Sequence, residues 1–114
     1  MKWKKLILLG DSNTQFGFSK GSGWVGDLAD ALQRKCDIMN RGFSGYNTDK
    51  IKIILPKIFN EFDVESICGV VIMLGSNDST KSTNEIQHVP LDRFESNMEH
   101  IIDYLINLGI DRNR

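Results

Sequence analysis

Three short segments of the chain, two of them nearly continuous apolar runs, predict buried strands. The segments are Lys5 to Gly10, Asp37 to Asn40 and Ile67 to Leu74. The third run (ICGVVIML) is apolar throughout and rich in β-branched residues, which favour strands. The second run is assigned by its position more than by its pattern.

Three segments with helical spacing of apolar residues alternate with these runs. We expect one helix from about Ser22 to Lys35, a second with Thr48 as its N-cap, and a third that starts at Pro90. Pro56 removes a backbone hydrogen bond inside the second helix and should kink it. The apolar stripe of this second helix consists of Ile51, Ile54, Leu55, Ile58, Phe59 and Phe62.

Strict alternation of strand and helix predicts an α/β fold with an open parallel sheet and right-handed crossovers. We expect a flavodoxin-like sheet with strand order 2-1-3, covered by helices on both faces as a three-layer sandwich. In that order the first and third strands are neighbours, and ligands bind in the crevice where the connections diverge. The length of 114 residues is enough for one small domain.

Composition and charge bear on which partners, cellular location and bound groups we expect for this chain. A net charge of −1 with 25% charged residues provides no basic surface for nucleic acid or an anionic membrane, so we expect neither partner. The apolar run from Leu6 to Leu9 is shorter than the roughly 7–15 residues of a signal peptide, and we expect a cytoplasmic protein. Cys36 and Cys68 have no metal-binding spacing, so we expect two buried thiols, no metal and no cofactor.

Polar loops directly follow the first and third predicted strands and carry candidate chemistry. Ser12 lies in the loop Gly10 to Thr14, and Asn77 lies in the loop Gly75 to Asp78. A serine at such a position can act as an acyl-accepting nucleophile when a base takes its proton. An asparagine amide and the backbone N–H of Gly45 can donate hydrogen bonds to the oxyanion that forms.

These residues resemble the first three sequence blocks of the GDSL/SGNH hydrolases. The strings GDSNTQFGF, NRGFSGYNT, IILP and GSNDS are similar to the isoamyl acetate-hydrolysing esterase subgroup of that family. The resemblance implies that Ser12 is the nucleophile and that Ser12 N–H, Gly45 N–H and the Asn77 side chain form the oxyanion hole. It further implies a small-molecule, short-chain ester as substrate, and supporting roles in the loops for Asp11, Gly75 and Asp78.

One block of the family is missing. The family's Asp-x-x-His block supplies the orienting acid and the general base, and no such sequence follows Asn77. His88 and His100 do not match the catalytic position. Because members of this family are roughly twice as long, we expect residues 1–114 to be a C-terminally truncated hydrolase domain that is weakly active or inactive.

Two other functions stay open at this point. In the first alternative, the chain would be a non-catalytic truncated form that acts by binding, or by self-association through the exposed edge of the third strand. In the second, it would be a flavodoxin-like nucleotide binder. The segment Gly21 to Gly26 matches the dinucleotide pattern GxGxxG, but it does not directly follow a strand as that motif requires. No phosphate-binding GxxxxGK[ST] loop is present.

Overall fold

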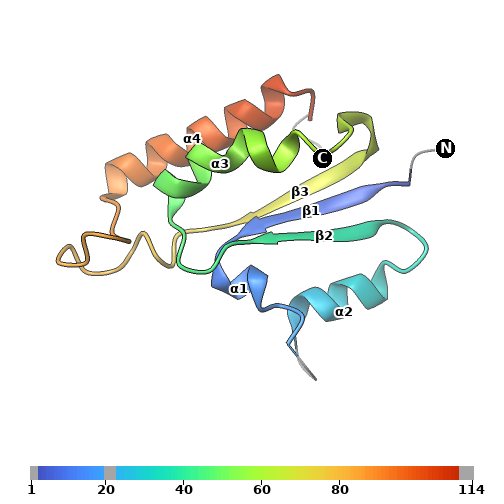
Figure 1. The fold of residues 1–114 in the computed structure, drawn as a ribbon, viewed down its shortest axis with the longest axis horizontal. Helices are drawn as coiled ribbons and strands as arrows, with labels where there is room; N and C mark the ends of the chain where they lie inside the picture. Colours follow the sequence, from blue (N-terminus) through green and yellow to red (C-terminus); the bar gives the residue numbers. More distant parts are fainter. Residues whose placement is uncertain (1–2, 20–22, 111–114) are drawn as a thin grey trace.

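Three parallel strands form a sheet with β1 at its centre. The computed structural model describes residues 3–19 and 23–110. The strand order β2-β1-β3 confirms the predicted 2-1-3 topology. Helices α3 and α4 cover one face of the sheet, and α1 and α2 lie on the other, which gives three layers (Figure 1). In chain order the elements are β1 (Lys5–Gly10), α1 (Ser12–Gln15), α2 (Trp24–Ala31), β2 (Asp37–Gly42), α3 (Thr48–Phe59), the 3-10 helix η1 (Val64–Ser66), β3 (Ile67–Met73) and α4 (Leu91–Asn107).

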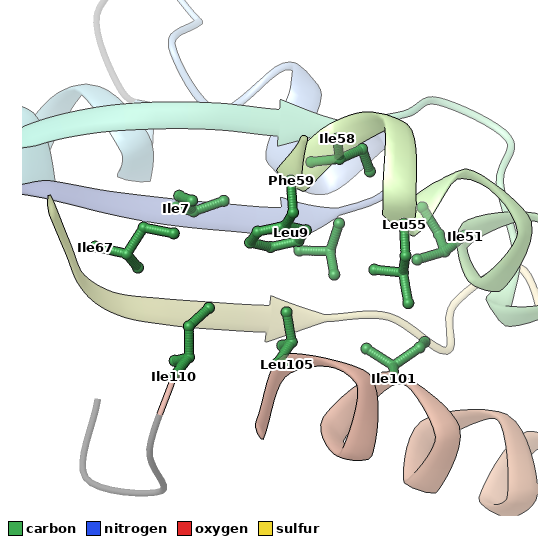
Figure 2. Packing of buried hydrophobic residues seen from close by; sticks show 10 residues of the cluster. All are labelled: Ile7, Leu9, Ile51, Leu55, Ile58, Phe59, Ile67, Ile101, Leu105 and Ile110. Atoms are coloured by element: carbon green, nitrogen blue, oxygen red, sulfur yellow. The ribbon is translucent and has the colours of Figure 1, made fainter. Parts of the chain in front are cut away.

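The hydrophobic core lies between the sheet and helices α3 and α4. Alternate residues of β1 point into it, because successive side chains of a strand face opposite sides. Each fully buried aliphatic side chain stabilises the fold by about 1.5–3 kcal/mol. The core cluster, most of which was predicted from the strand runs and helical stripes, consists of Ile7, Leu9, Ile51, Leu55, Ile58, Phe59, Ile67, Ile101, Leu105 and Ile110 (Figure 2).

On the opposite face of the sheet, helices cover β1 and β2 but leave part of β3 exposed. Helix α1 packs on β1 and β2, and α2 packs on β2. Val70 and Ile72 of β3 pack against the core cluster, so the residues between and after them point to the other face. There, Val71 is 37% exposed and Met73 is 42% exposed. Apolar side chains of β3 therefore reach solvent on this face.

Several predicted boundaries shift. The first predicted helix is shorter, because α2 covers Trp24–Ala31; its predicted start at Ser22 lies outside the described residues. Arg34, with φ of 65°, lies in the turn that follows. The second strand extends past Asn40 to Gly42, and the third ends at Met73.

Helix starts also differ from the prediction. Thr48 as N-cap is wrong: Asn47 is the N-cap of α3, and its side chain accepts a hydrogen bond from Lys50 N. Pro90 holds the N-cap position of α4, one residue before the first helical residue. Pro56 lies inside α3, which continues to Phe59, and the kink stays a prediction.

No helix in the described part of the chain is long and apolar enough to cross a bilayer. The cytoplasmic location stays a prediction.

Candidate active site

The loops that carry the predicted site residues leave the sheet at one edge. Gly10, the last residue of β1, pairs with Gly42 of β2 and with Met73 of β3. The carboxyl ends of all three strands therefore stand at the same level. Ser12 follows β1 by two residues, and the loops with Gly45 and Asn77 start from the two flanking strands.

Ser12 is the first residue of α1, directly after a tight turn from β1. Asp11 is buried and caps this helix, because its carboxylate accepts a hydrogen bond from Asn13 N at 3.0 Å. Gly10 allows the turn to be tight: a Cβ there would lie 2.2 Å from Thr14 Oγ1. The Ser12 side chain is half-buried, and its hydroxyl forms no hydrogen bond with another described residue.

The loop after β2 is held against the end of β1 and against α1. Phe43 N donates to Gly10 O at 2.9 Å, and Ser44 N donates to Gln15 Oε1 at 2.6 Å. A Cβ at Gly42 would lie 2.1 Å from Gln15 N, so only glycine permits this approach. Gly45 follows with φ of 82°, a conformation that favours glycine.

Asn77 reaches from the loop after β3 to the loop after β2. Its Nδ2 donates to Tyr46 O at 2.7 Å, next to Gly45 in the chain. A primary amide carries two N–H donors. One of them fixes the Asn77 side chain on the Tyr46 carbonyl, and the second is not used by any hydrogen bond with the described residues.

Asp78 fastens the same loop to the start of α3. Its buried carboxylate accepts from Thr48 N at 3.1 and 3.2 Å and from Thr48 Oγ1 at 2.5 Å. Asn97 of α4 donates to Thr48 Oγ1 at 2.9 Å, which satisfies that oxygen as an acceptor as well. A negative charge beside a helix N-terminus is favourable because of the helix dipole.

Two residues that sequence reasoning missed connect the loops further. Asn47 Nδ2 donates to Gln87 O at 2.9 Å, and Gln87 Nε2 donates to Gly45 O at 3.5 Å. The preference for Asn at helix N-caps was a signal for Asn47. No sequence pattern pointed to Gln87, because its contact with Gly45 joins positions far apart in the chain.

The two histidines do not complete the site. His88 Nδ1 lies 2.6 Å from Thr80 O, and its ring lines a cavity of about 300 Å³ together with Gly75, Leu91 and Phe94. His100 lies exposed on α4. Within the described ranges, neither histidine forms a hydrogen bond with Ser12. The same residues contain no group of three or more His, Cys, Asp or Glu side chains placed to hold a metal ion.

Comparisons with known proteins agree on the family. The model of the GDSL-like lipase/acylhydrolase family matches residues 8–111. The isoamyl acetate-hydrolyzing esterase 1 homolog of Rattus norvegicus is 49% identical over 98% of this chain and 45% of that protein. Its counterpart in Homo sapiens is 47% identical over 98% of this chain and 46% of that protein. The chain thus spans just under half the length of these relatives.

Solved structures show the same fold at low sequence identity. AlinE4, an SGNH-hydrolase family esterase, superimposes with a TM-score of 0.75 at 20% identity, covering 96% of this chain and 57% of that protein. A lipolytic protein of the G-D-S-L family from Desulfitobacterium hafniense DCB-2 has a TM-score of 0.70 at 22% identity, covering 94% of this chain and 55% of that chain. The α/β topology of this chain is therefore that of SGNH hydrolases.

Proposed function

Because the chain belongs to the GDSL-like lipase/acylhydrolase family, we propose that it holds the nucleophile and the oxyanion hole of a serine carboxylic ester hydrolase. The hydrogen bond from Asn77 Nδ2 to Tyr46 O carries the proposal, because it fixes a side-chain amide on the residue that follows Gly45 and leaves its second N–H without a hydrogen bond to the described residues. Ser12 begins a helix at the same edge of the sheet. The proposed nucleophile, with its own N–H, and two further proposed donors for an oxyanion thus belong to neighbouring loops.

In the proposed reaction, Ser12 Oγ attacks the ester carbonyl carbon while a base takes its proton. The carbonyl oxygen becomes an oxyanion that accepts hydrogen bonds from Ser12 N, Gly45 N and the second N–H of Asn77. One such donor contributes about 10²–10³ in rate in a studied protease. The alcohol leaves with a proton, and water then hydrolyses the acyl-Ser12 ester.

We further propose that the 114-residue chain alone turns over little substrate. It contains no Asp-x-x-His after Asn77, and His88 is bonded to Thr80 O instead of Ser12. Loss of triad members in serine proteases leaves about 10³–10⁴ over the uncatalysed rate, from the oxyanion hole and binding alone. The names of the rat and human relatives favour acetates and other short-chain esters as the substrate class.

An assay with 4-nitrophenyl acetate tests both parts of the proposal. In buffer, we expect the wild-type chain and Ser12→Ala to release nitrophenol at the same slow rate. Turnover in buffer that Ser12→Ala abolishes would show that the chain is active by itself and would refute the low-activity proposal.

Imidazole can then be added as an external base. We expect a rate above the reaction of imidazole with the ester itself, lost in Ser12→Ala and lowered in Asn77→Ala, because the variant lacks one oxyanion donor. An imidazole-dependent rate that is equal in wild type and Ser12→Ala would contradict the role of Ser12. Peptide mapping of the acetylated protein identifies the residue that carries the acyl group.

A second candidate function is self-association without catalysis, which the exposure of Val71 and Met73 at the sheet edge favours. An edge strand with apolar side chains is a template for pairing with another chain. Sedimentation equilibrium of the wild type and Met73→Lys tests it. Association that Met73→Lys disrupts supports this function, and a wild-type monomer that unfolds cooperatively contradicts it.

A further inference from the structure

Two cysteines flank one position of β1 at the end of the sheet opposite the candidate active site. Cys36 directly precedes β2, and Cys68 is the second residue of β3. Their chain neighbours Asp37 and Ile67 both pair with Lys5 of β1. The strand register therefore brings the two cysteines to the same end of the sheet from its two sides, although they are far apart in the sequence.

The two thiols interact with each other. Burial raises the pKa of Cys36, and the Cys68 thiol raises it further through its charge and a side-chain hydrogen bond; Asp37 adds a smaller effect of the same sign. Both cysteines are free and half-buried. A small oxidant can therefore reach both thiols, which lie at the same end of the sheet.

The backbone at both cysteines is free of the strand ladder. Strands on the two sides of a common neighbour stand roughly 9–10 Å apart, whereas a disulfide bond requires a Cα separation below about 7 Å. Cys36 precedes the first paired residue of β2, and Cys68 falls in the register shift between Lys5 and Leu6, where it has no partner on β1. A disulfide would therefore require local backbone movement at these two positions, including release of the hydrogen bond from Cys36 N to Leu32 O.

We propose that Cys36 and Cys68 are a redox-active pair that forms a reversible intramolecular disulfide with a small disulfide oxidant such as oxidised glutathione. One cysteine, as a thiolate, attacks a sulfur of the oxidant and releases one glutathione. The other, as a thiolate, attacks the protein sulfur of the mixed disulfide and releases the second glutathione. Two electrons pass from the protein thiols to the oxidant, and their two protons end on the released glutathione thiols.

The bond would join the starts of β2 and β3 across β1. It would close a loop that contains β2, α3 and η1, and so restrict the unfolded chain. The candidate active site lies at the other end of the strands, about 17–20 Å away for strands of this length. The redox pair is therefore independent of the proposed ester hydrolysis. Because the bond requires backbone movement, we expect reduced glutathione in excess to open it.

Oxidation of the native chain followed by mass spectrometry tests the proposal. The chain is incubated with oxidised glutathione in native buffer and in urea, remaining thiols are alkylated, and the protein is digested without reduction. In native buffer, we expect a monomer lighter by two hydrogen atoms, a peptide that joins Cys36 to Cys68, and a higher urea midpoint than that of the reduced chain.

Single variants provide the matched controls. Cys36→Ser and Cys68→Ser should each stop at a mixed disulfide with glutathione, and neither should change its urea midpoint by as much as the wild type. Mixed disulfides on both cysteines without a joined peptide, or joining between chains, would overturn the proposal. Joining in urea but not in native buffer would overturn it too, because the fold would then not bring the thiols together.

Discussion

Replacement of Asp78 is the sharpest test of how the loop after β3 is held. Asp78 is 3% exposed, and its carboxylate accepts hydrogen bonds from two donors of one residue, Thr48 N and Thr48 Oγ1. Asp78→Ala removes the acceptor and leaves the N–H of the first residue of α3 buried. A hydrogen bond to a charged group contributes about 1.5–3 kcal/mol, and the helix dipole adds about 0.3–1 kcal/mol. Because the residues around the lost carboxylate can relax, we expect less than the full sum of these contributions: Asp78→Ala should lower the free energy of unfolding by about 3–5 kcal/mol.

Asp78→Asn should destabilise less than Asp78→Ala, because the asparagine amide keeps the shape of the carboxylate and one of its acceptor oxygens. It loses the charge and one of the acceptors, so we expect a loss of about 1–2 kcal/mol. A small domain has only about 5–15 kcal/mol of stability in total, and Asp78→Asn remains measurable if Asp78→Ala does not fold. The assay is urea denaturation followed by circular dichroism.

Asp103→Ala is the matched control, because Asp103 lies exposed on α4. Exposed substitutions of this kind change stability by about 0.5 kcal/mol or less. If Asp78→Ala loses less than about 1 kcal/mol, or if Asp78→Asn equals Asp103→Ala, the reasoning from buried hydrogen bonds is refuted.

A double-mutant cycle with Thr48→Val assigns the effect to its contact. Thr48→Val removes the hydroxyl that donates to Asp78 and accepts from Asn97. Variants in direct contact are expected to be non-additive by about 0.5–3 kcal/mol. Additive losses in the double variant Asp78→Asn/Thr48→Val would show that the two residues act separately.

Four further predictions concern the core, helix α1, the contact of α1 with β2, and one thiol. Leu55→Ala should lower stability by about 2–5 kcal/mol in urea denaturation, because Leu55 is completely buried in the core; a loss below about 1 kcal/mol would contradict that packing. Thr14→Val should leave stability unchanged or raise it by up to about 1 kcal/mol, since Thr14 Oγ1 is buried without a hydrogen-bond partner among the described residues; a larger loss would reveal a partner. Gly42→Ala should destabilise by about 1–3 kcal/mol through the contact with Gln15 N, and a neutral result would contradict the close approach of α1 and β2. Cys36 should react with iodoacetamide more slowly at neutral pH than a free cysteine, because burial and the Cys68 thiol raise its pKa and so lower its thiolate fraction; a rate equal to that of free cysteine, measured in Cys68→Ser and in the wild type, would refute this.

The strands and their order were predictable because their signals are local and strong. The run from Ile67 to Leu74 is apolar enough to identify the strand without its neighbours, and the alternation with helices limits the sheet to few topologies. Helix α1 was not predictable, because its four residues from Ser12 to Gln15 are too few for a helical period.

The start of α3 shows where local reasoning fails. Asn47 and Thr48 are both residue types that cap helices, and the sequence favours neither decisively. The structure assigns the cap to Asn47 because the Thr48 hydroxyl donates to Asp78, which comes from a different loop. A contact between positions far apart in the chain thus decides a boundary that propensity leaves open.

The loops of the candidate site share one mode of attachment that no single segment reveals. In each case an asparagine amide of one element donates to a backbone carbonyl of another: Asn40 to Thr14 O at 2.8 Å, Asn47 to Gln87 O and Asn77 to Tyr46 O. Because an amide oxygen can accept while its N–H groups donate, Asn40 and Asn47 also hold their own loops, through Gly42 N and Lys50 N. These polar bonds, together with the packing of Phe43 and Tyr46 against the core, therefore hold the loops that carry the proposed oxyanion donors. Such preorganisation is the condition under which hydrogen-bond donors lower a reaction barrier most.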